Sequence, residues 1–222
     1  MAVLPQALRS LTPERVRDDV RLRAAALGLG LIPPRTMHSE QDARVLLDAA
    51  RGARRAVEIG VYEGGSALTL LAGLDAEAEL HLIDPFGSHP DALPGGWGAS
   101  EWATRRVIAR AARRRRGRAP RLRWHVARSH EVARGWSGGE LDLVFIDGDH
   151  SAEGCELDWR AWSPLVRGGG RVVFHDARAD QPRGRGLPGP TAVVARLFRA
   201  AQTPGWEIAA EADRTVAVRR LA

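Results

Sequence analysis

The chain has 222 residues, of which 44% are hydrophobic, so one domain with a sizeable core is expected. It has no apolar run of about 18 residues, no signal-peptide pattern and one cysteine, Cys155, which together predict a cytoplasmic protein without a membrane span. The net charge is +6 and all 33 basic residues are arginines, which excludes P-loop, Schiff-base and Tyr/Lys dehydrogenase mechanisms.

The apolar periodicity predicts two N-terminal helices, at residues 13–28 with Thr12 as N-cap and at residues 39–50. Strands then alternate with helices. The predicted strands are residues 56–59, 79–83, 121–126, 141–146, 171–174, 206–210 and 215–219. The intervening helices are residues 66–74, 101–116, 131–135, a segment ending at the Gly-rich residues 168–170, and residues 190–201. Residues 85–100 and 179–189 are predicted to be long Pro/Gly-rich loops.

This order is typical of a doubly wound α/β fold. The last two strands are joined only by residues 211–214, a link short enough to require an antiparallel pair. We therefore expect a Rossmann-like, mostly parallel seven-stranded sheet with a C-terminal antiparallel hairpin. The whole chain, residues 1–222, is interpreted as one domain, with an N-terminal helical cap at 1–52 and an α/β core at 53–222.

Polar clusters follow the fourth and fifth predicted strands. The first contains Asp147, Asp149 and His150, and the second contains His175 and Asp176. A strand-helix-strand unit with a right-handed crossover brings both clusters to the carboxyl edge of one sheet, where such folds bind ligands. Carboxylates and imidazoles gathered there indicate cation binding or proton transfer.

The first strand ends in a Gly-rich turn, AVEIGVYEGGSAL, and the second ends in HLIDPF. Glycine lets the backbone turn sharply next to a ligand, and the carboxylate ending the second strand can accept bonds from ribose hydroxyls. Glu58 suits a cationic amino group, and the turn lacks the G-x-G-x-x-G spacing of a pyrophosphate binder, which favours S-adenosylmethionine over NAD. The residues assigned to the cofactor are Glu58, Gly60, Tyr62, Gly64, Ser66, Asp84, Ser129 and Asp147.

These segments, with LDLVFIDGDHSAEGCELDW and GGGRVVFHD, resemble class I S-adenosylmethionine-dependent methyltransferases over roughly residues 40–220. More narrowly they resemble macrolide-sugar and aminocoumarin-sugar O-methyltransferases, and more distantly catechol O-methyltransferase. The resemblance implies a divalent metal, usually Mg²⁺, at Asp147 and Asp176, with His150 or Asp149 as the general base. Ala177 stands where such families commonly have a further ligand, so His175, Asp149 or water would replace it.

The expected reaction is metal-assisted O-methylation of a small hydroxylated molecule, such as a sugar, a polyketide or a phenol. Three alternatives remain: an NAD-type oxidoreductase, a nucleic-acid methyltransferase suggested by the arginine run at residues 113–118, and a non-catalytic binding module. No aromatic residue interleaves with the arginine run, so a solvated helix end is the simpler interpretation. A homodimer through the N-terminal helices is a further possibility, and His38, just before the second helix, is a candidate for a lid or substrate contact.

Overall fold

The computed structural model describes residues 19–87, 99–178, 186–200 and 203–222. Its strands are β1 (Arg55–Ile59), β2 (Glu79–Ile83), β3 (Arg121–His125), β4 (Leu141–Ile146), β5 (Val166–Phe174), β6 (Trp206–Ala212) and β7 (Thr215–Arg220). Its α-helices are α2 (Val20–Leu29), α3 (Glu40–Ala50), α4 (Gly65–Gly73), α5 (Glu101–Arg114), α6 (Ser129–Arg134), α7 (Ala152–Trp162) and α8 (Pro188–Val194). A 3-10 turn (Ser163–Leu165) precedes β5, and a π-helical turn (Ala195–Ala200) continues α8.

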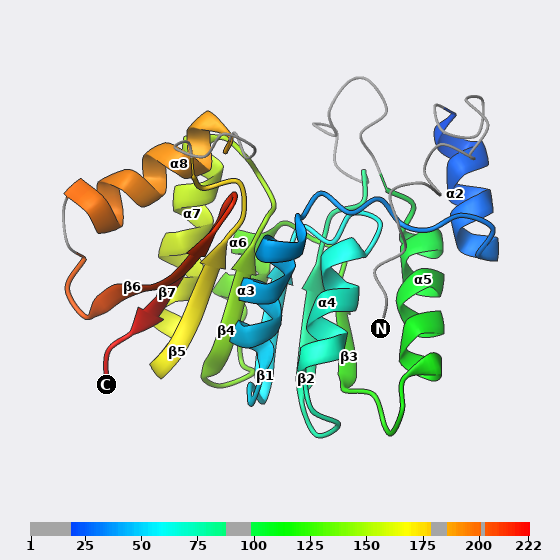
Figure 1. Ribbon diagram of the computed structural model, residues 1–222, viewed down its shortest axis with the longest axis horizontal. Coiled ribbons are helices and arrows are strands. Elements are labelled where there is room, and N and C mark those ends of the chain that lie inside the picture. Colours follow the sequence, from blue (N-terminus) through cyan, green and yellow to red (C-terminus); the bar gives the residue numbers. More distant parts are fainter. Residues whose placement is uncertain (1–18, 88–98, 179–185, 201–202) are drawn as a thin grey trace.

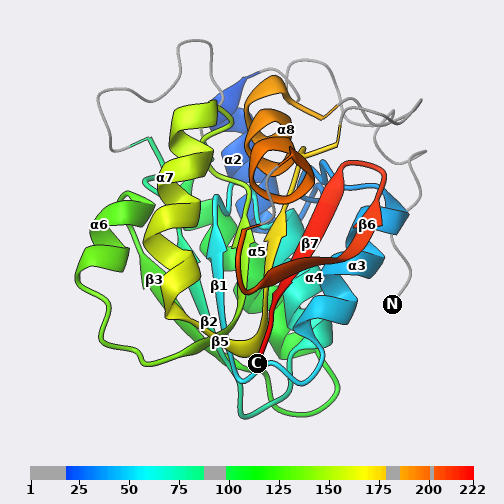
Figure 2. The same cartoon turned by 90° about the vertical axis from the view of Figure 1, so that its left-hand side faces the viewer.

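The seven strands form one sheet in the order β3-β2-β1-β4-β5-β7-β6. The first five strands are mutually parallel, whereas β7 is antiparallel to both β5 and β6. Figures 1 and 2 show the sheet between two helical layers, with α3, α4 and α5 on one face and α6, α7 and α8 on the other. This Rossmann-like architecture confirms the predicted fold, including the antiparallel hairpin.

Each face of the sheet has its own hydrophobic core. Leu46, Leu70 and Ile108 pack on one face with Phe145, and Trp159 and Trp162 belong to the core on the other face. Because helices cover both faces, a central strand such as β4 is apolar at nearly every position rather than alternating. The continuous apolar run was therefore a reliable sign of a central strand.

The two N-terminal helices occupy different places. The Asp19 carboxylate caps α2, which packs against α5, whereas α3 packs beside α4 and contacts the C-terminal hairpin. The predicted beginning of the first helix, at Thr12 and residue 13, lies outside the described residues. The chain between α2 and α3 runs along the carboxyl edge of the sheet (Figure 1), and we call residues 30–39 the strap.

Most element boundaries shift by one or two residues from the prediction, and three differences change the interpretation of a segment. The glycine run at residues 168–170 lies inside β5, where Leu141 pairs with Val166 and Leu143 with Arg171, so it forms an irregularity in the strand rather than a helix exit. Helix α8 begins at Pro188, because proline suits the first turn of a helix, so Gly189 is helical rather than part of the loop. The hairpin link is shorter than predicted, because β6 continues to Ala212.

The arginine run ends α5 in the way expected of a helix terminus. Arg115 donates hydrogen bonds to the carbonyl oxygens of Leu71, in the last turn of α4, and Leu74, the C-cap of that helix. The neighbouring Arg113, Arg114 and Arg116 are exposed. Cations near helix carbonyl ends are stabilising. The helices of the described chain are all too short or too polar to cross a bilayer.

Candidate functional site

The polar clusters that follow β4 and β5 meet at the carboxyl edge of the sheet. His175 Nδ1 lies 3.0 Å from Asp147 Oδ1, and His150 Nε2 lies 3.3 Å from the same oxygen. Asp176 Oδ2 lies 3.5 Å from His150 Nε2 and 3.6 Å from His175 Nδ1. Two carboxylates and two imidazoles therefore form one cluster. The prediction that the residues after β4 and β5 lie together is confirmed, because the two strands are neighbours in the sheet.

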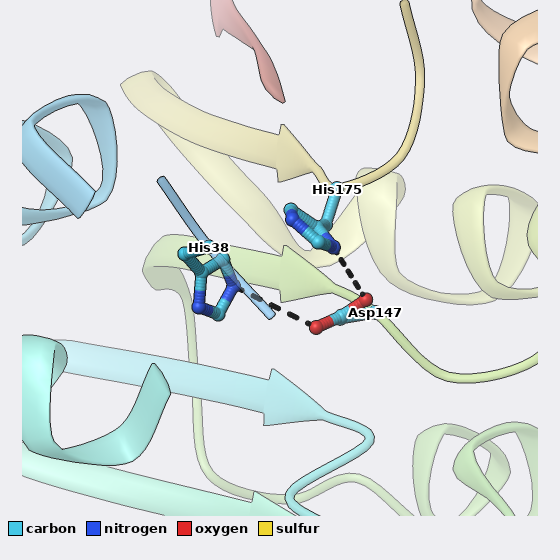
Figure 3. Close-up of side chains that lie close together, drawn as sticks. All are labelled: His38, Asp147 and His175. Atoms are coloured by element: carbon cyan, nitrogen blue, oxygen red, sulfur yellow. Dashed lines mark hydrogen bonds and ion pairs between the residues drawn. The ribbon is translucent and has the colours of Figure 1, made fainter. Parts of the chain in front are cut away.

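Two residues from distant parts of the chain complete this cluster. His38, at the end of the strap, places Nε2 3.7 Å from Asp147 Oδ2, and its ring meets that of His175 edge-on with centroids 4.3 Å apart. Arg214, in the turn between β6 and β7, places Nη1 2.9 Å from Asp176 Oδ1. Figure 3 shows His38 and His175 each facing a different oxygen of the Asp147 carboxylate.

The buried side chain of Asp42 fixes the segments that carry His38 and Arg214. Its Oδ2 accepts a hydrogen bond from the Ser39 N–H, which begins α3, and its Oδ1 accepts one from the Arg214 N–H. Arg214 in turn donates to the carbonyl oxygen of Met37. The hairpin turn and the strap are thus tied together directly beside Asp176 and Asp147.

The electrostatics of the cluster are dominated by the two carboxylates. Burial alone would raise the pKa of Asp147, but His175 and the hydrogen bond from His150 outweigh it and lower that pKa. Hydrogen bonds to Asp147 and Asp176 raise the pKa of His150 to about 10. Burial and the neighbouring His175 lower the pKa of His38 to about 4, so this imidazole is neutral. Burial opposes protonation of His175 too, but Asp147 raises its pKa.

Asp149 and Ala177 take no part in the cluster. The Asp149 Oδ1 accepts a hydrogen bond from the Ser151 N–H at 2.8 Å, and its side chain lies against Gly154 in the first turn of α7. This Asx-type turn precedes the N-cap Ser151 and turns the carboxylate away from Asp147. Ala177 is buried in the core, and its N–H donates to the carbonyl oxygen of Arg214.

The Gly-rich turn after β1 lies directly against this cluster. Gly60 has φ +85°, and a Cβ added there would be 2.1 Å from the carbonyl oxygen of Asp147. Only glycine therefore allows the turns after β1 and β4 to approach each other this closely. Gly64, with φ +87°, is the N-cap of α4.

Asp84 holds the turn through backbone bonds. Its Oδ2 accepts the N–H groups of Val61 at 2.9 Å and Tyr62 at 2.8 Å, and its Oδ1 accepts that of Phe86 at 2.7 Å. Burial nevertheless outweighs these bonds and raises the pKa of Asp84. The carboxylate is thus fixed at the end of β2 beside the turn.

Glu58, the penultimate residue of β1, is fully buried. Its Oε1 accepts a hydrogen bond from the hydroxyl of Ser66, and its Oε2 has no hydrogen-bond partner among the described residues. Burial raises the pKa of Glu58 well above its usual value, and nearby Asp147 and Asp84 raise it further. Such a carboxyl group is suited to a cationic partner.

The strap is also fastened to the Gly-rich turn, through a residue that the sequence did not single out. Glu63 accepts two hydrogen bonds from the Arg23 guanidinium, both at 2.6 Å, and one from the Arg35 N–H at 2.6 Å. The Arg35 side chain donates to the Tyr62 hydroxyl at 3.0 Å. The carbonyl of Arg35 passes so close to Gly65 that a Cβ there would lie 2.7 Å from it.

Ser129 has a different environment from the one expected. Its hydroxyl donates to Asp158 Oδ1 at 2.5 Å and accepts from Trp162 Nε1 at 2.8 Å, so it joins α6 to α7. Its O–H and one of its two acceptor positions are therefore used inside the protein.

Asp158 provides a pH-dependent test of this internal network. Burial raises its pKa to about 6, above the value in an unfolded chain, so its contribution favours folding at low pH and is lost as the pH rises through about 6. We expect Asp158→Asn, which keeps the acceptor oxygen, to raise the free energy of unfolding by roughly 1–3 kcal/mol at about pH 8. Urea denaturation should show this gain shrinking by about 2 kcal/mol at about pH 4.5. An equal effect at both pH values would contradict the assigned ionisation.

Comparison with known proteins agrees with this architecture. Residues 57–177, more than half of the chain, match the family described as "Methyltransferase domain". The "Putative O-methyltransferase" of Mycolicibacterium smegmatis is 29% identical over 187 residues, covering 79% of this chain and 74% of the relative.

Solved structures share the fold across nearly the whole chain. Cofactor-bound Rv0187 from MTB has a TM-score of 0.62 at 20% identity, covering 99% of this chain and 98% of its own. The Streptomyces achromogenes O-methyltransferase TomG, involved in tomaymycin synthesis and solved with S-adenosylmethionine, has a TM-score of 0.57 at 20% identity, covering 92% and 91%. The chain belongs to the methyltransferase-domain family, with the fold of S-adenosylmethionine-dependent O-methyltransferases.

Proposed function

We propose that this methyltransferase transfers the methyl group of S-adenosylmethionine to a hydroxyl oxygen of a small molecule, such as a sugar, polyketide or phenolic natural product. The observation that carries the proposal is the contact between the Gly-rich turn and the cluster around Asp147, through Gly60. A cofactor held by that turn has its reactive end beside carboxylates and imidazoles that can deprotonate an acceptor. The O-methyltransferase relatives support the same reaction.

The cofactor would be bound by residues that the structure gathers around the turn. Glu58 offers an unpaired buried carboxyl oxygen to the amino group of the methionine moiety. Asp84, at the end of β2, has lone pairs left on both oxygens for the ribose hydroxyls. The N-terminal N–H groups of α4, around Gly65 and Ser66, face the methionine carboxylate in this arrangement.

The residues at Asp147 fit a divalent cation. Four donor-atom separations in the cluster lie between 3.0 and 3.6 Å, which is close to the spacing of neighbouring ligands with metal bonds of about 2.1 Å. Asp147 and Asp176 would hold a divalent ion, for which the sequence suggested Mg²⁺, with His175 in place of the ligand missing at Ala177. Bound there, a divalent ion polarises the acceptor hydroxyl and lowers its pKa.

His150 is the residue we assign to proton transfer. Its side chain is 38% exposed, so it can meet an acceptor, and it contacts both Asp147 and Asp176. The two carboxylates favour its protonated form, and a cation held by the same carboxylates competes with that proton. Asp149, the alternative base, is bound to the Ser151 N–H instead.

The alternative functions considered from the sequence have less support. The match to a methyltransferase family favours methyl transfer over an NAD-type oxidoreductase. The hypothesis of a nucleic-acid substrate depended on the arginine run at residues 113–118. Arg115 of this run is bound to main-chain carbonyl oxygens at the end of α4, which is a structural role. We place the reaction in the cytoplasm on composition, since the single cysteine, Cys155, is a buried free thiol.

Calorimetric titration with S-adenosylmethionine tests the proposal directly. We expect micromolar binding by the wild type and binding about 10–100-fold weaker in Asp84→Ala, because a half-buried ribose acceptor and the support of the turn are both lost. Asp75→Ala, which removes an exposed carboxylate after α4, is the matched control and should bind normally. Absence of binding by the wild type, with Mg²⁺ or with EDTA, would overturn the proposal. Binding would be followed by an acceptor screen over hydroxylated natural products.

A further inference from the structure

A nitrogen-rich group of side chains lies within the proposed metal site. His38, Asp147 and His175 each offer one ligand atom, and these atoms all lie within 4.8 Å of one another. Figure 3 shows that the three come from three separate places, namely the strap, the end of β4 and the end of β5. Nothing in the sequence pattern FIDGDH and FHD requires the residue from the strap.

His38 is the most informative member of this group. Its side chain is only 4% exposed, and neither of its ring nitrogens has a hydrogen-bond partner among the described residues. The same holds for Nε2 of His175, whose side chain is 1% exposed. Burying polar atoms without partners is unfavourable by about 1–3 kcal/mol for each group. The nitrogens that face the half-buried Asp147 carboxylate are His38 Nε2, 3.7 Å from Oδ2, and His175 Nδ1, 3.0 Å from Oδ1, so both are placed to share an ion with it.

The donor atoms decide which ions suit the site. Imidazole nitrogen is a good ligand for manganese, iron, cobalt and zinc, whereas magnesium prefers carboxylate, carbonyl and water oxygens. Two imidazoles and one carboxylate form a set that first-row transition metals use, with positions left open for a substrate. Arg214 pairs with Asp176 Oδ1, and Ala177 offers no oxygen, so the oxygen ligands that magnesium needs are reduced.

We propose that His38, Asp147 and His175 bind a first-row transition-metal dication in preference to magnesium. The inference deepens the proposed function, because it gives the identity of the ion at the same site. His38 is held at the site by the strap, because the carbonyl oxygen of the preceding Met37 accepts a hydrogen bond from Arg214. The N-terminal strap therefore supplies a ligand as well as covering the Gly-rich turn.

Metal titration of untagged, EDTA-treated and dialysed protein tests this assignment without measuring methyl transfer. We expect cobalt(II) to give visible absorption bands on binding, zinc to displace it at equimolar amounts, and magnesium to require at least about 100-fold more. His38→Gln and His175→Gln should each weaken cobalt binding at least about tenfold and change the absorption spectrum. His130→Gln, which removes an imidazole on α6 outside this group of donor atoms, is the matched control and should bind cobalt like the wild type.

The inference would be overturned by magnesium binding as tightly as cobalt, or by normal cobalt binding and spectrum in His38→Gln. No cobalt binding by the wild type would overturn it as well. Thermal melts identify a variant that fails to fold, in which case the other histidine variant decides. Calorimetry with S-adenosylmethionine reports the proposed function separately, so loss of one result does not imply loss of the other.

Discussion

Replacing Asp147 with asparagine is expected to lower kcat/KM for methyl transfer by roughly 10³-fold. Although the sequence also assigned Asp147 to the cofactor, its contacts are with histidines, so S-adenosylmethionine binding should change little. Among the described residues, Asp147 is the one carboxylate within 4 Å of all three imidazoles of the cluster, those of His38, His150 and His175. Asparagine keeps the shape but removes the charge, so the variant loses both the anionic metal ligand and the partner that orients the histidines. Steady-state formation of S-adenosylhomocysteine with an acceptor from the screen measures the effect.

The structure supplies a control for the lost charge. Asp48→Asn removes an exposed carboxylate of α3 that pairs only with Arg51 in the described chain, and it should leave kcat/KM unchanged. Calorimetry separates a catalytic effect from a binding effect, because the Asp147 variant should bind S-adenosylmethionine within about threefold of the wild type. A decrease of less than about tenfold in kcat/KM would show that the chemistry does not centre on Asp147.

The fold could be predicted because its signals are local. The apolar run of β4 is bounded by polar residues, and both of its ends were placed correctly at Leu141 and Ile146. The antiparallel hairpin followed from a link too short for a crossover. The glycine run inside β5 was misread because glycine is as common in turns as in strand irregularities, and only pairing with β4 distinguishes the two.

The site was predictable only in part, because some of its residues are placed by local sequence and topology and others by tertiary contacts. Asp147, His150, His175 and Asp176 follow neighbouring strands, so topology alone brings them together. His38 and Arg214 arrive from the strap and the hairpin turn, and their positions depend on the tertiary bonds of Asp42. The orientation of Asp149 could have been read locally, since an aspartate two residues before a helix N-cap readily bonds to the backbone. The orientation of the Ser129 hydroxyl depends on its hydrogen bond to Asp158 of α7, so it could not be predicted from the local sequence.

Binding of S-adenosylmethionine is expected to release up to about one proton, because Glu58 should be protonated alone and ionised when the ammonium group docks. The raised pKa of Glu58 has burial as its main cause, opposed by the hydrogen bond from Ser66. A bound ammonium would lower that pKa again by direct attraction. Calorimetry of metal-free protein in buffers with different ionisation enthalpies measures the number of protons released.

Glu58→Gln tests the residue responsible. The glutamine can still accept the Ser66 hydroxyl, but it carries no charge, so we expect binding about 10–100-fold weaker and no proton release. Glu156→Gln, on α7, removes a carboxylate paired with Arg160 and Arg196 and should leave both quantities unchanged. Because burial raises the pKa of Glu58 in the free protein, the proton release should decrease as the pH rises and more of Glu58 is already ionised. Equal binding enthalpies in all buffers, with normal affinity in Glu58→Gln, would place the ammonium group elsewhere, and Glu58 would then be a buried carboxylic acid that only fixes Ser66 at the start of α4.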